Sequence, residues 1–318
     1  MPHGTIQDSS SRVDLQNLAL EHYTALERAV STLLSTKLAA ETFAQVVDGI
    51  PIRDVYKEYY GYRRKDFNNH ISPSQPALEA VESYRQNFNI GSLQLDTKAA
   101  QAYQNTTKGS RDFNLRLLEA LAVICHDIAV RLYYQYEGGL HRPDPESIHQ
   151  QILVPELPPS VILAPVKSKP AELFHPSYQN WKRYPHGLAD IVGYWVEYRL
   201  FGGVVLFDRG ENSSACSDAF IHPIGRYQIF QLSDVQIRRY VGFLLLEGIE
   251  PESGEIRFHA EKYARRIDPY DAMHLHIYRD RYEREIPEVI PVRCVGRGED
   301  MPGYEESLKD LARRSGRE

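Results

Sequence analysis

The chain has 318 residues, a formal net charge of −6, 42% hydrophobic and 25% charged residues, and three cysteines. This composition is typical of a globular protein with a large apolar core, and it argues against a disulfide-stabilised scaffold and a nucleic-acid-binding protein. The first residues lack a signal-peptide pattern and no apolar run reaches the ~20 residues that span a bilayer. We therefore expect a cytoplasmic or nucleocytoplasmic protein with no membrane partner.

The first part of the chain predicts a polar tail followed by helices. Residues 1–11 have the composition of a disordered tail, and residues 12–140 predict an all-helical domain. Ser11 and Asp14 have the spacing of a capping box, and apolar residues then recur at helical intervals as far as Pro51. They predict one long helix, or two helices joined at a kink. Shorter helices are expected after Pro51.

The strongest helical pattern covers about residues 111–136, where apolar residues form one stripe with a period of 3.6 residues. In this register His126 and Asp127 fall away from the stripe, so we expect both to be exposed rather than catalytic. No strand is expected between residues 12 and 137.

Eight prolines between residues 141 and 176 predict a linker, because proline disfavours long helices and central strands. Residues 177–318 predict an α+β domain with a small sheet, since short apolar runs alternate irregularly with helical patterns. Ser233 and Gln236 form a capping box that opens one helix. Further strands are expected at 160–166, 202–210, 226–232, 255–260 and 288–295, and a final helix at 304–314.

The stretch RYPHGLADIVGYW (183–195) predicts a helix from about residue 187 with two distinct faces. Its apolar face is expected to pack on the strand at 202–210. Its other face carries polar residues that could line a cleft together with groups near the end of that strand. The candidate site residues are His186, Asp190, Tyr194, Glu197, Asp208, Arg209 and His222.

Imidazole and carboxylate groups in this pattern suit general acid–base catalysis, and they could also bind a divalent metal. The alternative is a solvated acidic face, on which Asp190 stabilises the start of its helix through the helix dipole. The common zinc-protease, phosphate-loop, serine-hydrolase and dinucleotide motifs are missing from the sequence. The sequence therefore predicts no metal site and identifies no cofactor.

Two other chemical groups require interpretation. His274 and His276 would share one face of a strand, but DPYDA (268–272) is typical of a helix start, and a helix separates the two imidazoles. We expect the helix and no metal site there. The cysteines are expected to be free thiols, and Cys216 near His222 is a weak candidate nucleophile because closeness in sequence does not establish a pair.

The segments HPSYQNWKRYPHGLADIVGYWVEYRLFGGVVLFDRG and DPYDAMHLHIYRDRYEREIP resemble a family of uncharacterised intracellular proteins of filamentous fungi. The likeness covers about residues 175–295. It implies an intracellular fungal origin and one structural unit around these motifs, and it transfers no catalytic residue.

Two functions fit these patterns. The first is an enzyme that acts on a small molecule by acid–base, or metal-assisted, chemistry in a cleft of the C-terminal domain. The alternative is a non-catalytic binding or scaffolding protein, in which the N-terminal helices hold a partner or a second copy of the chain. A cleft with perturbed pKa values would favour the enzyme, and a large exposed apolar patch would favour the scaffold.

Overall fold

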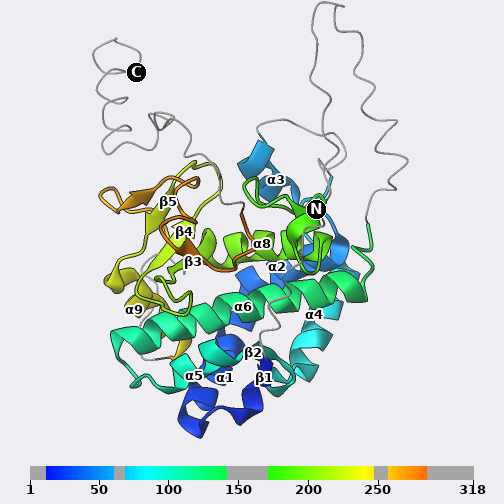
Figure 1. Cartoon of the computed structure of the whole chain (residues 1–318). Coiled ribbons are helices and arrows are strands. Elements are labelled where there is room, and N and C mark those ends of the chain that lie inside the picture. Colours follow the sequence, from blue (N-terminus) through cyan, green and yellow to red (C-terminus); the bar gives the residue numbers. More distant parts are fainter. Residues whose placement is uncertain (1–11, 61–68, 142–170, 247–256, 285–318) are drawn as a thin grey trace, which may run out of the picture.

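The computed structural model describes residues 12–60, 69–141, 171–246 and 257–284 (Figure 1). Several expected features lie outside these ranges: the tail 1–11, most of the 141–176 linker, the strands at 160–166 and 288–295, the helix at 304–314, and Cys294. Within the described ranges, no helix is both long and apolar enough to cross a membrane.

The N-terminal part is mainly helical, as expected. The expected long helix is divided in two at Ser35 and Thr36, and the Thr36 side chain accepts a hydrogen bond from the backbone of Ala39 (3.1 Å) to start the second helix. The expected helix at 111–136 is confirmed. The helices are α1 (Leu20–Leu34), α2 (Lys37–Asp48), α3 (Arg53–Tyr60), α4 (Gln75–Asn87), α5 (Thr97–Gln104) and α6 (Arg111–Gln135).

The prediction that residues 12–137 contain no strand is wrong. Strand β1 (Arg12–Asp14) pairs with β2 (Gln94–Asp96) in an antiparallel ladder. Ser11 lies outside the described residues, but Asp14 lies in a strand rather than in the first turn of a helix, so the capping box predicted at Ser11 and Asp14 is wrong as well. Segments of three residues are too short to show a two-residue alternation, so the helical pattern around them dominates the sequence signal.

The later part combines helices with one antiparallel sheet, which confirms the expected α+β fold. Among the described residues the sheet has five strands in the order β6-β5-β4-β3-β7. The capping box of Ser233 and Gln236 is present at the start of α9. The elements are α8 (Leu188–Phe201), β3 (Val204–Asp208), β4 (Ala219–His222), β5 (Ile229–Gln231), α9 (Asp234–Leu244), β6 (Arg266–Ile267) and β7 (Ile277–Tyr278).

Two local predictions in this part are wrong. Residues 257–260, within the strand expected at 255–260, are irregular. The helix expected from Asp268 does not form, because residues 269–276 are turns, although Asp268 does accept a hydrogen bond from the Tyr270 backbone (2.9 Å). The chain then leaves the helical conformation because Ile277 pairs with Asp208 at the edge of the sheet.

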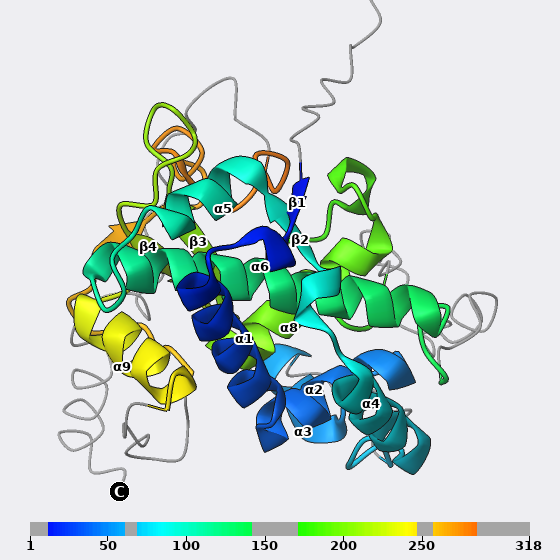
Figure 2. The same cartoon turned by 90° about the horizontal axis from the view of Figure 1, so that it is seen from below.

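Helix α8 forms the centre of the fold, between α6 and β3 (Figures 1 and 2). Its side chains from Ala189 to Phe201 are all buried. The two faces of β3 carry separate apolar clusters: Val205 lies with Trp195 in one, and Val204 lies with Ile191 in the other. The strand is thus buried on both faces, as its continuous apolar sequence predicts.

Gly193 allows α8 to approach α6 closely. A Cβ atom at this position would lie 2.5 Å from the imidazole ring of His126. The glycine therefore leaves the space in which a histidine side chain of α6 lies against the backbone of α8.

We expect Gly193→Ala to lower the free energy of unfolding by about 1–3 kcal/mol, because the added methyl group overlaps the His126 ring. Urea denaturation measures this loss. The matched control is the same substitution in a His126→Ala background, where the methyl group has room and the loss should largely disappear. An equal loss in both backgrounds, or a gain in stability from better helix propensity, would contradict this packing.

Candidate functional site

The polar face predicted on α8 is buried rather than solvated. Asp190, Tyr194 and Glu197 all have almost no exposed surface. His186 precedes the helix and is exposed, and its backbone N–H donates a hydrogen bond to Asp190 Oδ2 (2.7 Å). The face therefore lies against other parts of the protein, and its chemistry depends on the groups that meet it there.

The main partner of this face is His126 of α6, which is 4% exposed. Its Nε2 lies 3.0 Å from Asp190 Oδ1 and its Nδ1 lies 2.8 Å from Glu197 Oε1. Burial and the charge of Arg279 lower the pKa of His126, but hydrogen bonds to the two carboxylates outweigh them and raise it overall. Both ring nitrogens thus face a carboxylate, which favours the imidazolium form, although Arg279 Nη1 also lies 3.1 Å from Nδ1.

The sequence prediction that His126 is exposed is wrong. A second helix, α8, covers the flank of α6 that a single apolar stripe leaves toward solvent. The sequence pattern of α6 alone does not show that α8, with Gly193 at the point where the helices cross, will cover His126.

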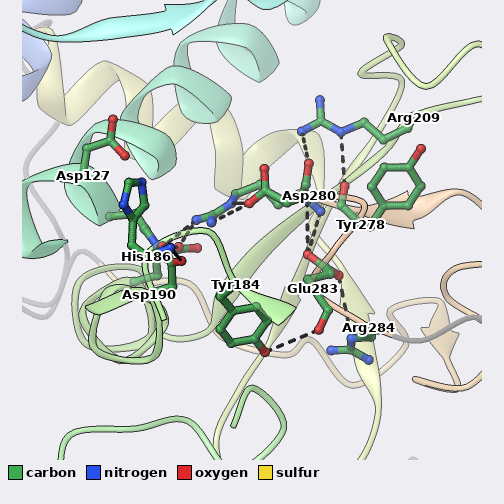
Figure 3. A network of polar contacts seen from close by, with 12 residues as sticks. Asp127, Tyr184, His186, Asp190, Arg209, Tyr278, Asp280, Glu283 and Arg284 are labelled. Atoms are coloured by element: carbon green, nitrogen blue, oxygen red, sulfur yellow. Dashed lines mark hydrogen bonds and ion pairs between the residues drawn. The ribbon is translucent and has the colours of Figure 1, made fainter. Parts of the chain in front are cut away.

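Arg279 adds a second buried cation to the same carboxylates. Its Nη1 donates to Glu197, and its Nε and Nη2 lie 2.6 Å from Asp280 Oδ2. The guanidinium carbon lies 4.9 Å from the centre of the Tyr194 ring, in a cation–π contact. Figure 3 shows this network between the α8 residues and the segment that carries Asp280, Glu283 and Arg284.

Glu283 holds the turn that carries Arg279 and Asp280. Its Oε2 accepts a hydrogen bond from the backbone N–H of Arg279 (2.9 Å), and its side chain is buried. Burial raises the pKa of Glu283 from its usual 4.5 to about 7, although the positive charge of Arg284 opposes the shift. This carboxyl group therefore changes its charge close to neutral pH.

Stacked side chains connect this network to a second cluster. The rings of Tyr194 and Tyr178 stack with their centres 4.6 Å apart, and the Arg284 guanidinium lies 4.8 Å from the centre of Tyr178. Arg284 Nη2 also lies 2.7 Å from Nδ1 of the buried His222. Tyr178 thus lies between His222 and Tyr194 of the α8 face.

The second cluster does not form an activated serine. Ser177 Oγ lies 3.5 Å from His222 Nε2, which is the spacing of a loose nucleophile–base pair. However, Arg284 donates to Nδ1, so the proton of the neutral ring must be on Nε2, which then cannot accept the serine proton. Burial and the charges of Arg284 and His175 lower the pKa of His222 far below its usual value, which keeps the ring neutral.

The structure separates the remaining predicted residues from the network around His126. Asp208 Oδ1 accepts a hydrogen bond from the backbone of Gly210 (3.0 Å) and so supports a turn. Arg209 forms a buried ion pair with Glu119 of α6 and donates to the backbone carbonyl of Arg279 (2.9 Å). It positions the 279–284 segment rather than facing the α8 residues.

Cys216 is a poor candidate nucleophile. Its thiol is free and buried, and burial raises its pKa far above the usual value, with a further contribution from the negative charge of Glu119. A nucleophilic cysteine must instead form a thiolate near neutral pH.

Asp127 lies at the exposed end of the network, near His186 (Figure 3). Its side chain is 20% exposed, and the closest approach to a cation is 3.9 Å, from Arg12 Nη1 to Asp127 Oδ2. Burial raises the pKa of Asp127, although the positive charges of His126, Arg12 and Arg279 partly oppose the shift. Asp127 was expected to be exposed, and it is only partly so.

Among the described residues, no group of three or more histidine, cysteine, aspartate or glutamate side chains is arranged to hold a metal ion. His274 is exposed and His276 is partly exposed. Both lie in a turn, and not in the helix or the strand considered for them from the sequence. Comparison with protein-family models, curated proteins and solved structures gives no match to this chain. Its site must therefore be interpreted from its own chemistry.

Replacing Glu283 by glutamine tests its charge. Between about pH 4.5 and 7 the folded protein retains a proton on Glu283 that the unfolded chain has released, so stability is highest below this window and falls as pH rises through it. We expect Glu283→Gln to remove this dependence. The difference in the free energy of unfolding between variant and parent should therefore be about 3 kcal/mol more favourable to the variant at pH 8 than at pH 4. Urea denaturation at both pH values measures the difference.

The control is Glu211→Gln, at an exposed glutamate, which should give the same small difference at both pH values. An effect of Glu283→Gln that does not change with pH would show that Glu283 is ionised throughout the range.

Proposed function

We propose that the protein is an enzyme that acts on a small molecule by acid–base catalysis, and that Asp127 is the group that exchanges the proton with substrate. One observation carries the proposal. Asp127 is a partly exposed carboxyl group with a raised pKa, and Asp190, which is hydrogen-bonded to the adjacent His126, has a lowered pKa. Two carboxyl groups of one site with opposite pKa shifts are typical of catalytic acid–base pairs.

The cause of the shift differs between the two groups. Burial would also raise the pKa of Asp190, but hydrogen bonds from His126 and from the His186 backbone lower it overall. Asp190 therefore stays ionised and holds the imidazolium. Asp127 receives no such hydrogen bond among the described residues, so its proton is retained to higher pH and can be transferred.

The buried network supports this role by fixing the position of Asp127. His126 precedes Asp127 in α6, and its two hydrogen bonds to α8 hold this turn of the helix. A carboxyl group that is held in this way can keep the hydrogen-bond distance to a reacting atom that proton transfer requires. Asp190, Glu197, His126 and Arg279 are in this account positioning residues, because they are buried and contact one another.

The scaffolding alternative has weaker support. Large apolar side chains are exposed in the N-terminal part at Leu20 of α1, at Ile71 in a loop, at Tyr134 of α6 and at Leu140. Single exposed apolar residues are ordinary, and only a contiguous patch would indicate a partner surface. Binding of a partner or of a second copy, the fungal origin and the cytoplasmic location stay predictions from the sequence.

The proposal is tested by incubating the full chain with a mixture of small metabolites and following their depletion by mass spectrometry. We expect the parent protein to deplete at least one compound, and Asp127→Asn to lower that rate by about 10²–10⁴-fold with little change in melting temperature. The matched control is Asp112→Asn, an exposed aspartate of the same helix, which should keep the parent rate.

Depletion of the same compounds by Asp127→Asn at the parent rate would contradict the role of Asp127. Failure of the parent protein to alter any compound would contradict the enzyme and favour the scaffold.

A further inference from the structure

We propose that Tyr198 and Arg199 form a binding site for the carboxylate group of a small ligand, and that Glu58 of the same chain occupies this site in the structure. The site lies at the end of α8 opposite to Asp190, because Asp190 is in the first turn of the helix and Arg199 is in the last. It is therefore separate from the network around His126, and the inference does not depend on the proposed function.

Two buried donors of α8 meet at one carboxylate oxygen. The Tyr198 hydroxyl donates to Glu58 Oε2 (2.6 Å), and Arg199 Nη1 donates to the same oxygen (2.9 Å). Tyr198 is 7% exposed and Arg199 is 8% exposed. Burial, together with the hydrogen bond and the charge of Glu58, raises the pKa of Tyr198 to about 12, so its hydroxyl keeps its proton at neutral pH. The protein thus holds a neutral and a charged donor at hydrogen-bond distance from one carboxylate.

Glu58 satisfies these donors only in part. It uses Oε2 for both hydrogen bonds, and its Oε1 has no partner among the described residues. Arg199 Nε is buried, and in the same part of the chain it has no hydrogen-bond partner either. A guanidinium group has five N–H donors and pairs best with a carboxylate through two parallel hydrogen bonds. A ligand that is not tethered to a helix can turn to form the second bond that Glu58 does not form.

Glu58 can leave the site without movement of its helix. Its side chain is 46% exposed, whereas that of Arg199 is 10% exposed. Rotation of the Glu58 side chain therefore brings its carboxylate into water, while Val55 and Tyr56 stay buried and anchor α3. An ion pair with one partner this exposed contributes little to stability. Arg199 cannot follow Glu58 into water, and a buried cation without a partner is costly, so the vacated site requires another anion.

The charges at the site favour a carboxylate over a phosphate. Among the described residues, only Arg199 forms an ion pair with Glu58. The other two cations of α3, Arg53 and Lys57, both contact Asp54 instead. One guanidinium balances the single charge of a carboxylate, and the second charge of a phosphate dianion would have no counterpart there. We therefore expect a ligand that presents one carboxylate group.

The test is an NMR titration of the full chain, labelled with ¹⁵N, with propionate, which has the length of the Glu58 side chain. The Nε–H signal of Arg199 reports binding. Glu58→Ala vacates the site, and we expect propionate to shift this signal to saturation with a Kd on the order of 1 mM. In the parent, where Glu58 competes, the Kd should be about tenfold higher or more.

Neutral and phosphate probes define the ligand class. Propionamide has the shape of propionate without its charge and should not shift the Arg199 signal. Inorganic phosphate, compared at equal ionic strength, should bind about tenfold more weakly than propionate. Tyr198→Phe in the Glu58→Ala background should raise the Kd of propionate about fivefold, because one hydrogen bond is lost.

The matched control is Asp54→Ala, which removes an exposed carboxylate and its ion pairs from the same helix. It should bind propionate no better than the parent. If Glu58→Ala does not fold, Glu58→Gln replaces it, since glutamine keeps the shape of the side chain and removes its charge. The inference is overturned if propionate leaves the Arg199 signal unchanged in the Glu58 variant, or if propionamide or phosphate binds as well as propionate. Equal binding of propionate by the parent, by Asp54→Ala and by the Glu58 variant would also overturn it.

Discussion

The site depends on one interaction, the imidazolium of His126 held between Asp190 and Glu197. A buried charge is costly unless it is paired and hydrogen-bonded, and here each ring nitrogen meets a carboxylate oxygen within one helix crossing. The crossing in turn requires Gly193, because a larger residue would overlap the ring. Asp127 follows His126 in α6 and Asp280 follows Arg279, so this interaction fixes where both partly exposed carboxyl groups lie.

Buried ions of this kind are weak evidence for stability, since well-packed apolar residues often stabilise a core as well or better. Their effect here is on geometry. Arg279 and Glu283 tie the 279–284 segment to α8, and Arg209 ties the same segment to Glu119 of α6. Three parts of the chain that are far apart in sequence are thereby held at fixed positions around the exposed end of the network.

The fold was largely predictable from local patterns, and the site was predictable only in part. Continuous helical stripes and capping residues located α6 and α9, and an unbroken apolar run located β3. The partners of Asp190 and Glu197 could not be found in the same way, because His126 lies 64 and 71 residues before them. His126 is buried by its contact with α8, whereas the apolar stripe of α6 predicted that it faces solvent.

The turn at 269–276 shows the same limit for backbone structure. Its sequence begins as a helix should, yet strand pairing with Asp208 determines how it ends. Arg279 and Glu283 follow that turn, so no periodic pattern marked them. One signal was present: two carboxylates within a largely apolar helix require buried cations, and a search for histidine and arginine in other apolar segments would have found His126.

The protonation state of His126 tests this account most directly. In protein labelled with ¹⁵N, the ring nitrogens of His126 report whether each carries a proton, and a pH titration gives the pKa. The account predicts an imidazolium with both nitrogens protonated at pH 7 and a pKa above the usual value of 6.5, lowered when Asp190 is replaced by asparagine. A neutral ring at pH 7, with one unprotonated nitrogen and no response to Asp190→Asn, would contradict it.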